Sequence, residues 1–203
     1  MNKGAIQRFA IWARNELIAQ VSQRAYQYGI TKEGCGEANA VTVGGRALTG
    51  DEQKQRKELV DQIRSKGYTQ VMEEVAYTWF NRLIAIRFME VNDYLPSHIR
   101  VLSSESGKVE PDLVTTPFDA ELDFTHDEQE TILRLKTDNA LDELFRLLFI
   151  KQCNALNEIL PALFEKTSDY TELLLNLSVV DQDGVVYHLS LIHISEPTRR
   201  VVI

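Results

Sequence analysis

One stretch of this chain, residues 68–94, restricts the fold more than any other. On a helical wheel its apolar residues cover far more than one stripe, which is typical of a helix surrounded by protein on most sides. Two charged residues, Arg87 and Glu90, fall inside the apolar arc and lie three positions apart, on neighbouring turns. Because buried charges are costly unless paired, each needs a partner, and the other is one candidate. The rest of the chain is therefore expected to fold around a buried central helix.

The other apolar patterns are helical too. Residues 4–28 repeat apolar positions at steps of three and four, and Gly29 is placed to end that helix. Thr49 and Thr125 each open a capping box, with Glu52 and Glu128 at the third following position. Helices are predicted over 4–28, 50–66, 68–94, 126–136, 141–159 and 169–177, with Pro161 as an interruption. The expected stripes are Ile6, Phe9, Ala13, Leu17, Val21, Ala25 and Tyr28 in the first helix, Leu59, Val60 and Ile63 in the second, and Leu141, Leu144, Phe145, Leu148, Phe149, Leu156 and Ile159 in the fifth.

Two stretches lack helical periodicity. Residues 29–50 carry glycines at 34, 36, 44, 45 and 50, which predicts a loop with a short hairpin around residues 41–43. Residues 97–124 carry two prolines and a Ser-Ser pair, which predicts a long ordered loop. The expected fold class is all-α: an irregular multi-helix domain with a buried central helix and long loops.

Composition narrows the classes of partner. The chain has 22 basic and 30 acidic residues and a net charge of −8, whereas domains that grip duplex DNA by themselves are usually basic. No uninterrupted apolar run approaches the roughly 18 residues of a membrane helix, and the first eight residues turn polar too soon for a signal peptide. Cys35 and Cys153 have no paired spacing and are expected to be reduced thiols. We therefore expect a cytoplasmic protein without a membrane partner.

The sequence offers no clear constellation for catalysis, cofactor binding or metal binding. The glycines at 34–36 and 44–45 fit neither the Walker nor the dinucleotide pattern. His98, His126, His188 and His193 have no spacing typical of a nucleophile and base or of a metal site. Trp79, Phe80 and Phe88 recur at helical spacing without interleaved basic residues, which favours core positions over base stacking. We therefore expect no catalytic, cofactor-binding or metal-binding residues in this chain.

One nuclease-like pattern remains as a minor alternative. Pro111-Asp112 is followed by Glu121 and Asp123, acidic side chains that could hold a divalent cation. The lysine that this kind of site uses to stabilise developing charge is replaced by Asp123. A metal-dependent nuclease that uses Asp112, Glu121 and Asp123 is thus a poor match.

A family resemblance appears in the central helix. The block Glu74-Val75-Ala76-Tyr77-Thr78-Trp79-Phe80-Asn81-Arg82-Leu83, continuing to Pro96, closely resembles the amino-terminal region of PglX, the adenine-specific DNA methyltransferase family of BREX phage-exclusion systems. Residues 9–14, 100–105, 141–157 and 169–174 resemble further parts of that region in the same order. The resemblance covers about residues 1–187.

The resemblance implies transfer of a methyl group from S-adenosylmethionine to adenine in DNA, with the base flipped out of the duplex and with other BREX proteins as partners. The family's Asn-Pro-Pro-Tyr motif and glycine-rich cofactor loop are absent here, and no two of the five prolines are adjacent. No catalytic or cofactor residue can be carried over. We therefore expect an amino-terminal, non-catalytic segment of such an enzyme.

The end of the chain departs from this resemblance. Residues 189–199 resemble a translated sequencing-library adaptor, although Leu189, Leu191 and Ile194 partly alternate with polar residues as an edge strand would. The expected division is a helical domain over residues 1–188 and a non-native tail over residues 189–203. The alternative function is a stand-alone acidic helical interaction module without enzymatic activity.

Overall fold

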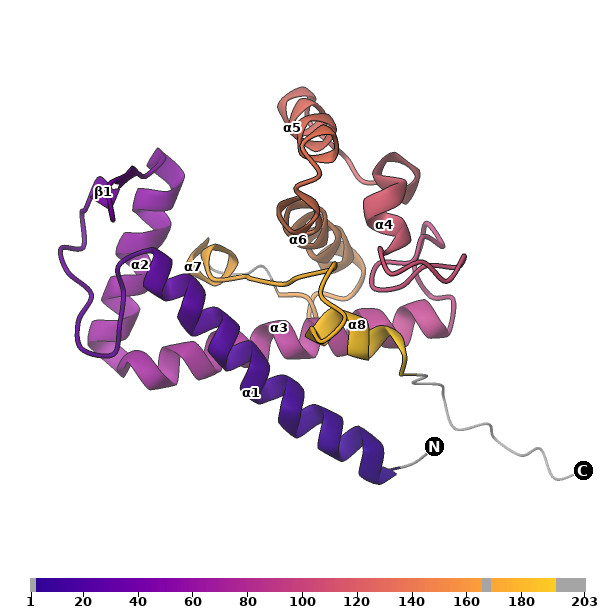
Figure 1. Ribbon diagram of the computed structural model, residues 1–203, viewed down its shortest axis with the longest axis horizontal. Helices are drawn as coiled ribbons and strands as arrows, with labels where there is room; N and C mark the ends of the chain where they lie inside the picture. The colour runs from indigo at the N-terminus through magenta and orange to yellow at the C-terminus, as the bar shows by residue number, and fades with distance from the viewer. Residues whose placement is uncertain (1–2, 166–168, 193–203) are drawn as a thin grey trace, which may run out of the picture. The chain divides into compact units, whose positions relative to one another are not determined.

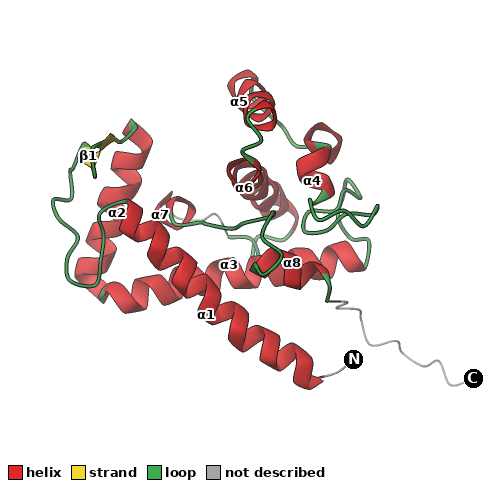
Figure 2. Ribbon diagram, in the orientation of Figure 1, coloured by secondary structure: helices red, strands yellow, loops and turns green. Residues whose placement is uncertain are grey.

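The computed structural model describes residues 3–165 and 169–192, and it confirms the all-α fold class (Figure 2). Its α-helices are α1 (Lys3–Gln27), α2 (Gly50–Lys66), α3 (Tyr68–Val91), α4 (Asp112–Thr115), α5 (His126–Thr137), α6 (Leu141–Ile159), α7 (Asp169–Leu173) and α8 (Val185–Ser190). A 3-10 helix, η1 (Pro117–Ala120), and an antiparallel hairpin of β1 (Thr42–Val43) and β2 (Arg46–Ala47) complete the described elements. Among the described residues, none of the helices combines the length and the hydropathy of a membrane-spanning segment.

The helices belong to two compact units. Unit 1 comprises residues 1–81 and 156–176, and unit 2 comprises residues 82–155 and 177–203. α3 and α6 each contribute residues to both units. The expected boundary at residue 188 stays a prediction, because residues 193–203 of the expected tail lie outside the described residues.

In unit 1, α1 has the predicted stripe over most of its length. Ala13, Leu17, Val21, Ala25 and Tyr28 are all buried, whereas Ile6 and Phe9 are only half-buried. Gly29 ends the helix in the left-handed region, with φ of 69°, and the backbone N–H of Ile30 returns to Ala25 O at 3.1 Å. The predicted end of this helix is therefore confirmed.

The loop after α1 lies along α2 (Figure 1) and is fastened to it by Arg56. This guanidinium is 2% exposed and donates to four backbone carbonyls: Tyr28 at 2.8 Å, Cys35 at 2.7 Å, Glu37 at 2.5 Å and Ala38 at 3.2 Å. The three apolar residues predicted for the core face of α2 are buried as expected. The sequence did not predict the burial or the loop contacts of Arg56, because its partners are backbone carbonyls, which every residue has.

The predicted hairpin is present. Gly44 and Gly45 have φ of 56° and 81° between β1 and β2, as a two-residue type I′ connection requires. The predicted capping box is present too, because Thr49 accepts from the N–H of Glu52 and Glu52 accepts from the N–H of Thr49. Glu52 also accepts from the Tyr28 hydroxyl at 2.9 Å and from Arg46 at 3.0 Å, so one carboxylate joins α1, the hairpin and α2.

The remaining elements of unit 1 close its core. Gly67, with φ of 91°, separates α2 from α3 as predicted. Trp79 is 1% exposed, and its indole N–H donates to Thr171 O in α7 at 3.1 Å. Arg24 of α1 reaches Leu173 O at 3.4 Å. Trp79 is thus a core residue, as its helical spacing predicted.

Unit 2 is built around the apolar face of α6. Phe145 and Phe149 are fully buried, with stacked rings 5.3 Å apart between centroids. The second predicted capping box, Thr125 with Glu128, is present, and Glu128 also pairs with Lys151 of α6 at 2.8 Å. Asp142 accepts from the N–H of Val179 at 2.8 Å, which ties the segment before α8 to the start of α6.

Three sequence expectations need correction. The stretch 97–124 contains two short helices, α4 and η1, because Pro111 and Pro117 begin tight helical turns. α7 ends at Leu173 rather than at residue 177. Residues 185–190 form the unpredicted helix α8, whose six residues are too few to show helical periodicity.

Candidate functional site

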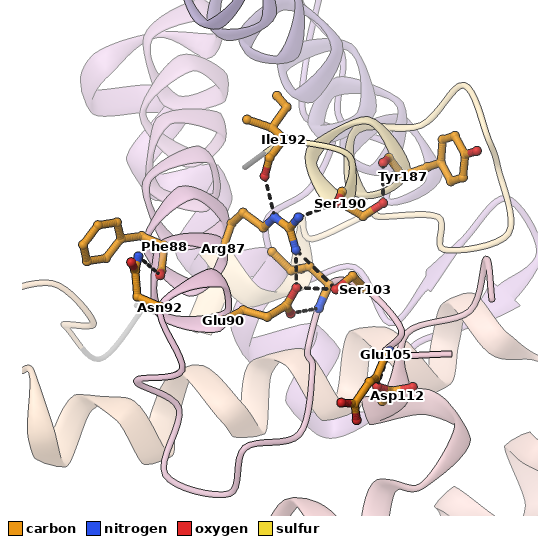
Figure 3. A network of polar contacts seen from close by, with 11 residues as sticks. Arg87, Phe88, Glu90, Asn92, Ser103, Glu105, Asp112, Tyr187, Ser190 and Ile192 are labelled. Carbon is orange, nitrogen blue, oxygen red and sulfur yellow. Dashed lines mark hydrogen bonds and ion pairs between the residues drawn. The ribbon is translucent and has the colours of Figure 1, made fainter. Parts of the chain in front are cut away.

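The most developed polar cluster in the described residues lies in unit 2, on the second half of α3 (Figure 3). Arg87 and Glu90, one turn apart, form an ion pair with 2.5 Å between Arg87 Nη1 and Glu90 Oε1. Their side chains are only 3% and 1% exposed. The expectation that each buried charge needs a partner is confirmed, and the two satisfy part of that need with each other.

The second oxygen of Glu90 fixes the loop that follows α3. Glu90 Oε2 accepts from the backbone N–H of Leu102 at 2.7 Å, and Oε1 accepts from Ser103 Oγ at 2.5 Å. Leu102 is itself 1% exposed, so the same loop position contributes an apolar side chain to the core. The carboxylate therefore holds the chain reversal between α3 and α4.

Arg87 uses its remaining donors on the end of α8. Its Nε donates to Ile192 O at 2.9 Å, its Nη2 donates to Ser190 O, and its Nη1 also reaches Ser103 Oγ at 3.2 Å. The last carbonyls of a helix carry partial negative charge, so a guanidinium is a favourable partner. Burial lowers the pKa of Arg87, and the Glu90 carboxylate opposes that shift.

We call this cluster, made of Arg87, Glu90, Ser103 and the carbonyls of Ser190 and Ile192, the α3 clamp. Each nitrogen of its guanidinium and each oxygen of its carboxylate has a partner within the chain. Catalytic acids, bases and nucleophiles need an atom within reach of a substrate. The clamp therefore positions α3, the following loop and α8. Its backbone partners were not foreseen, because backbone groups have no residue signature.

The acidic residues of the nuclease hypothesis are used differently. Asp112 accepts from Ser104 Oγ at 2.7 Å and from the N–H of Glu105 at 2.9 Å, and so shapes the loop before α4 (Figure 3). Glu121 ends η1 with a left-handed φ of 53°. Across residues 3–165 and 169–192, no three His, Cys, Asp or Glu side chains gather closely enough to hold a metal ion. The geometry gives the nuclease hypothesis no support.

The remaining candidate side chains lie apart. His98 contacts Asp93 at 2.7 Å and His126 contacts Glu130 at 3.4 Å, and all four side chains are more than two-thirds exposed. Asp93 raises the pKa of His98 through their hydrogen bond. Cys35 is half-buried and Cys153 is buried, and neither forms a disulfide. His193 lies outside the described residues.

A depression of about 680 Å³ lies in unit 1 at the joint between α2 and α3. Its rim includes Lys32, Lys66, Tyr68 and Glu73, of which only Tyr68 is half-buried. Lys66 is engaged by Glu74 at 2.8 Å. Small-molecule sites bury most of the ligand against preformed walls, whereas this depression is open and lined by exposed side chains.

Comparison with known proteins relates the chain to a family of enzymes. No family model matches the chain. It is 42% identical, over an alignment of 211 positions including gaps, to the adenine-specific methyltransferase PglX of Lacticaseibacillus casei (strain Zhang), a match that covers 93% of this chain. The chain is homologous to a segment of PglX. It spans 17% of the length of that PglX protein.

A second relative supports the PglX relationship. The adenine-specific methyltransferase BrxX of Escherichia coli O9:H4 (strain HS) is 37% identical over an alignment of 112 positions, which covers 51% of this chain and 9% of BrxX. Both relatives are named as adenine-specific methyltransferases, as the sequence resemblance implied. The chain thus corresponds to a small part of the PglX and BrxX proteins.

Proposed function

We propose that this chain is the helical, non-catalytic segment of an adenine-specific DNA methyltransferase of the PglX type. The observation that carries the proposal is the extent of the match, which takes in 93% of this chain but only 17% of PglX. A segment of that size is large enough to form its own core. The sequence lacks the paired prolines and the glycine-rich loop expected for methyl transfer to adenine.

The proposed role of the segment is to position the catalytic part of the enzyme on DNA or on a partner protein. The part of the α3 clamp that lies within residues 1–188 supports this role, because the buried Glu90 carboxylate pairs with Arg87, Leu102 and Ser103 and so holds the loop after α3 in one arrangement. The net charge of −8 supports a contact with protein rather than a direct grip on DNA phosphates. For the whole enzyme, we propose S-adenosylmethionine as the cofactor, DNA as the substrate and other BREX proteins as partners. We also propose that the whole enzyme acts in the cytoplasm, in phage defence.

A methyl-transfer assay tests the proposal. PglX of Lacticaseibacillus casei is prepared intact, with the segment matched by this chain deleted, and with that segment replaced by the matched part of this chain. We expect intact PglX and the PglX that carries the matched part of this chain to incorporate labelled methyl groups into DNA adenine. We expect no incorporation by PglX that lacks the segment or by this chain alone. Methyl transfer by this chain alone, or full activity of the deleted protein, would refute a non-catalytic positioning role.

The same assay separates the alternative function, an acidic interaction module that acts by itself. That function predicts that the replaced PglX protein remains inactive although the chain is folded. The chain would then bind a protein partner without supporting methylation.

A further inference from the structure

The end of α6 in unit 1 carries an unusual surface. Five consecutive apolar residues, Ile159, Leu160, Pro161, Ala162 and Leu163, are all exposed. The three largest of them are 56%, 39% and 47% exposed. We call these residues the 159–163 run. Single exposed apolar residues are ordinary, but a run of more than three or four in a folded domain is unfavourable unless something covers it.

The shape of the run is fixed by hydrogen bonds to the chain around it. The N–H of Leu160 donates to Leu156 O at 2.8 Å, and the N–H groups of Leu163 and Phe164 both donate to Leu160 O at 3.0 Å. Asn157 Nδ2 donates to Phe164 O at 2.7 Å, and Phe164 is 1% exposed. The run is therefore a turn anchored at both ends, and a partner would meet a preformed surface without first ordering it.

The charges around the run indicate what kind of surface fits it. Glu158 and Glu165 flank it, and both are exposed. The run also follows the carboxyl end of α6, where helix carbonyls carry partial negative charge. A complementary surface is apolar at its centre, with lysine or arginine at its rim.

We propose that the 159–163 run is the surface on which the remainder of the PglX-type protein docks. The inference rests on the proposed function. The matched segment makes up 17% of PglX, so more than four fifths of that protein lies outside it and is available to cover the run. A contact inside one polypeptide would keep such an apolar surface covered, because the covering part is always present at high effective concentration.

The test places a photo-crosslinking amino acid, p-benzoylphenylalanine, at position 163 of the PglX protein that carries the matched part of this chain. The control position is Val41, which is 59% exposed but stands alone in a hairpin loop. Crosslinks from position 163 are expected on peptides of the PglX portion of the same polypeptide, and none from position 41. Crosslinks from position 163 only to a second copy or to this chain's own residues, or none, would overturn the proposal.

Matched substitutions give a second measurement. Ile159→Ser and Leu163→Ser replace the two most exposed large residues of the run without adding negative charge at the end of α6, so in the 203-residue chain alone they should leave the circular dichroism spectrum unchanged and shift the melting temperature by no more than a few degrees. In the PglX protein that carries this chain they should raise the rate of limited proteolysis at least about tenfold, because docking is lost. The matched control, Val41→Ser, should not change that rate. Equal proteolysis of all variants would contradict docking through the run.

The two proposals fail in different ways. If the PglX protein that carries this chain shows the crosslink from position 163 but transfers no methyl group, the docking surface is supported and the proposed function is refuted. If that protein methylates DNA but shows no such crosslink, the proposed function is supported and the docking surface is refuted. If the joined protein does not fold, the labelled 203-residue chain is mixed with PglX that lacks the matched segment. Absence of the crosslink there overturns the docking proposal.

Discussion

Removing the carboxylate of the α3 clamp is the sharpest test of how unit 2 is held together. In Glu90→Ala, the Arg87 guanidinium, 3% exposed, loses its counter-charge, and the N–H of Leu102 and the hydroxyl of Ser103 lose their acceptor. Leaving one member of a buried ion pair alone costs about 3–5 kcal/mol. For a chain of this size that corresponds to a fall in melting temperature of roughly 6 to 20 °C.

The measurement is thermal and urea unfolding followed by circular dichroism, with hydrogen exchange of the α8 amides as a local readout. Exchange in α8 should rise, because Arg87 holds the carbonyls of Ser190 and Ile192 only while it is itself held. Ser103→Ala removes a hydroxyl that donates to Glu90 and accepts from Arg87, but it leaves the ion pair in place and should cost about 1.5–3 kcal/mol. Glu130→Ala, at an exposed carboxylate, should leave the unfolding midpoint unchanged.

A double variant separates charge pairing from packing. Arg87→Met with Glu90→Leu removes both charges, and replacing a buried pair by apolar residues is often close to neutral. The double variant should therefore be more stable than Glu90→Ala. Loss of less than about 1 kcal/mol in Glu90→Ala, or a double variant no better than the single one, would refute the view that an unpaired buried charge causes the loss.

Three further predictions concern the other fixed points of the fold. Arg56→Met should free the loop that Arg56 binds through four carbonyls, so limited proteolysis should cut within residues 35–40 faster than in the unaltered chain. Thr49→Ala and Thr125→Ala each remove a helix cap and should each lower the unfolding free energy by about 1 kcal/mol, measured by urea unfolding. Burial raises the pKa of Glu52, but its hydrogen bonds to Thr49, Arg46 and Tyr28 outweigh this and leave the pKa below the ordinary value. Ionised Glu52 therefore stabilises the folded state fully above about pH 4.3, the pKa of this carboxyl in the unfolded chain. This stabilisation is lost as the pH falls through the lower pKa of Glu52 in the folded chain. Glu52→Gln should flatten the fall of melting temperature over that acidic range.

The extent of the core could be predicted only in part. In α6, Leu144, Phe145, Leu148, Phe149 and Leu156 are buried as their spacing predicted, whereas Ile159 in the same pattern is 56% exposed. Periodicity shows which residues share a helix face, but it does not show where along the helix the covering elements stop. The half-buried Ile6 and Phe9 in α1 illustrate the same limit.

The sequence by itself determined the local structure and the relationship to PglX. Capping boxes, glycine breaks and apolar spacing act over a few residues, so they can be read from neighbours along the chain. It also indicated that Arg87 and Glu90 had to be buried and paired. Only the tertiary structure decided which distant backbone groups complete that pairing, since Arg87 reaches carbonyls 103 and 105 residues away. It likewise decided which apolar residues remain uncovered, because burial depends on how distant segments pack.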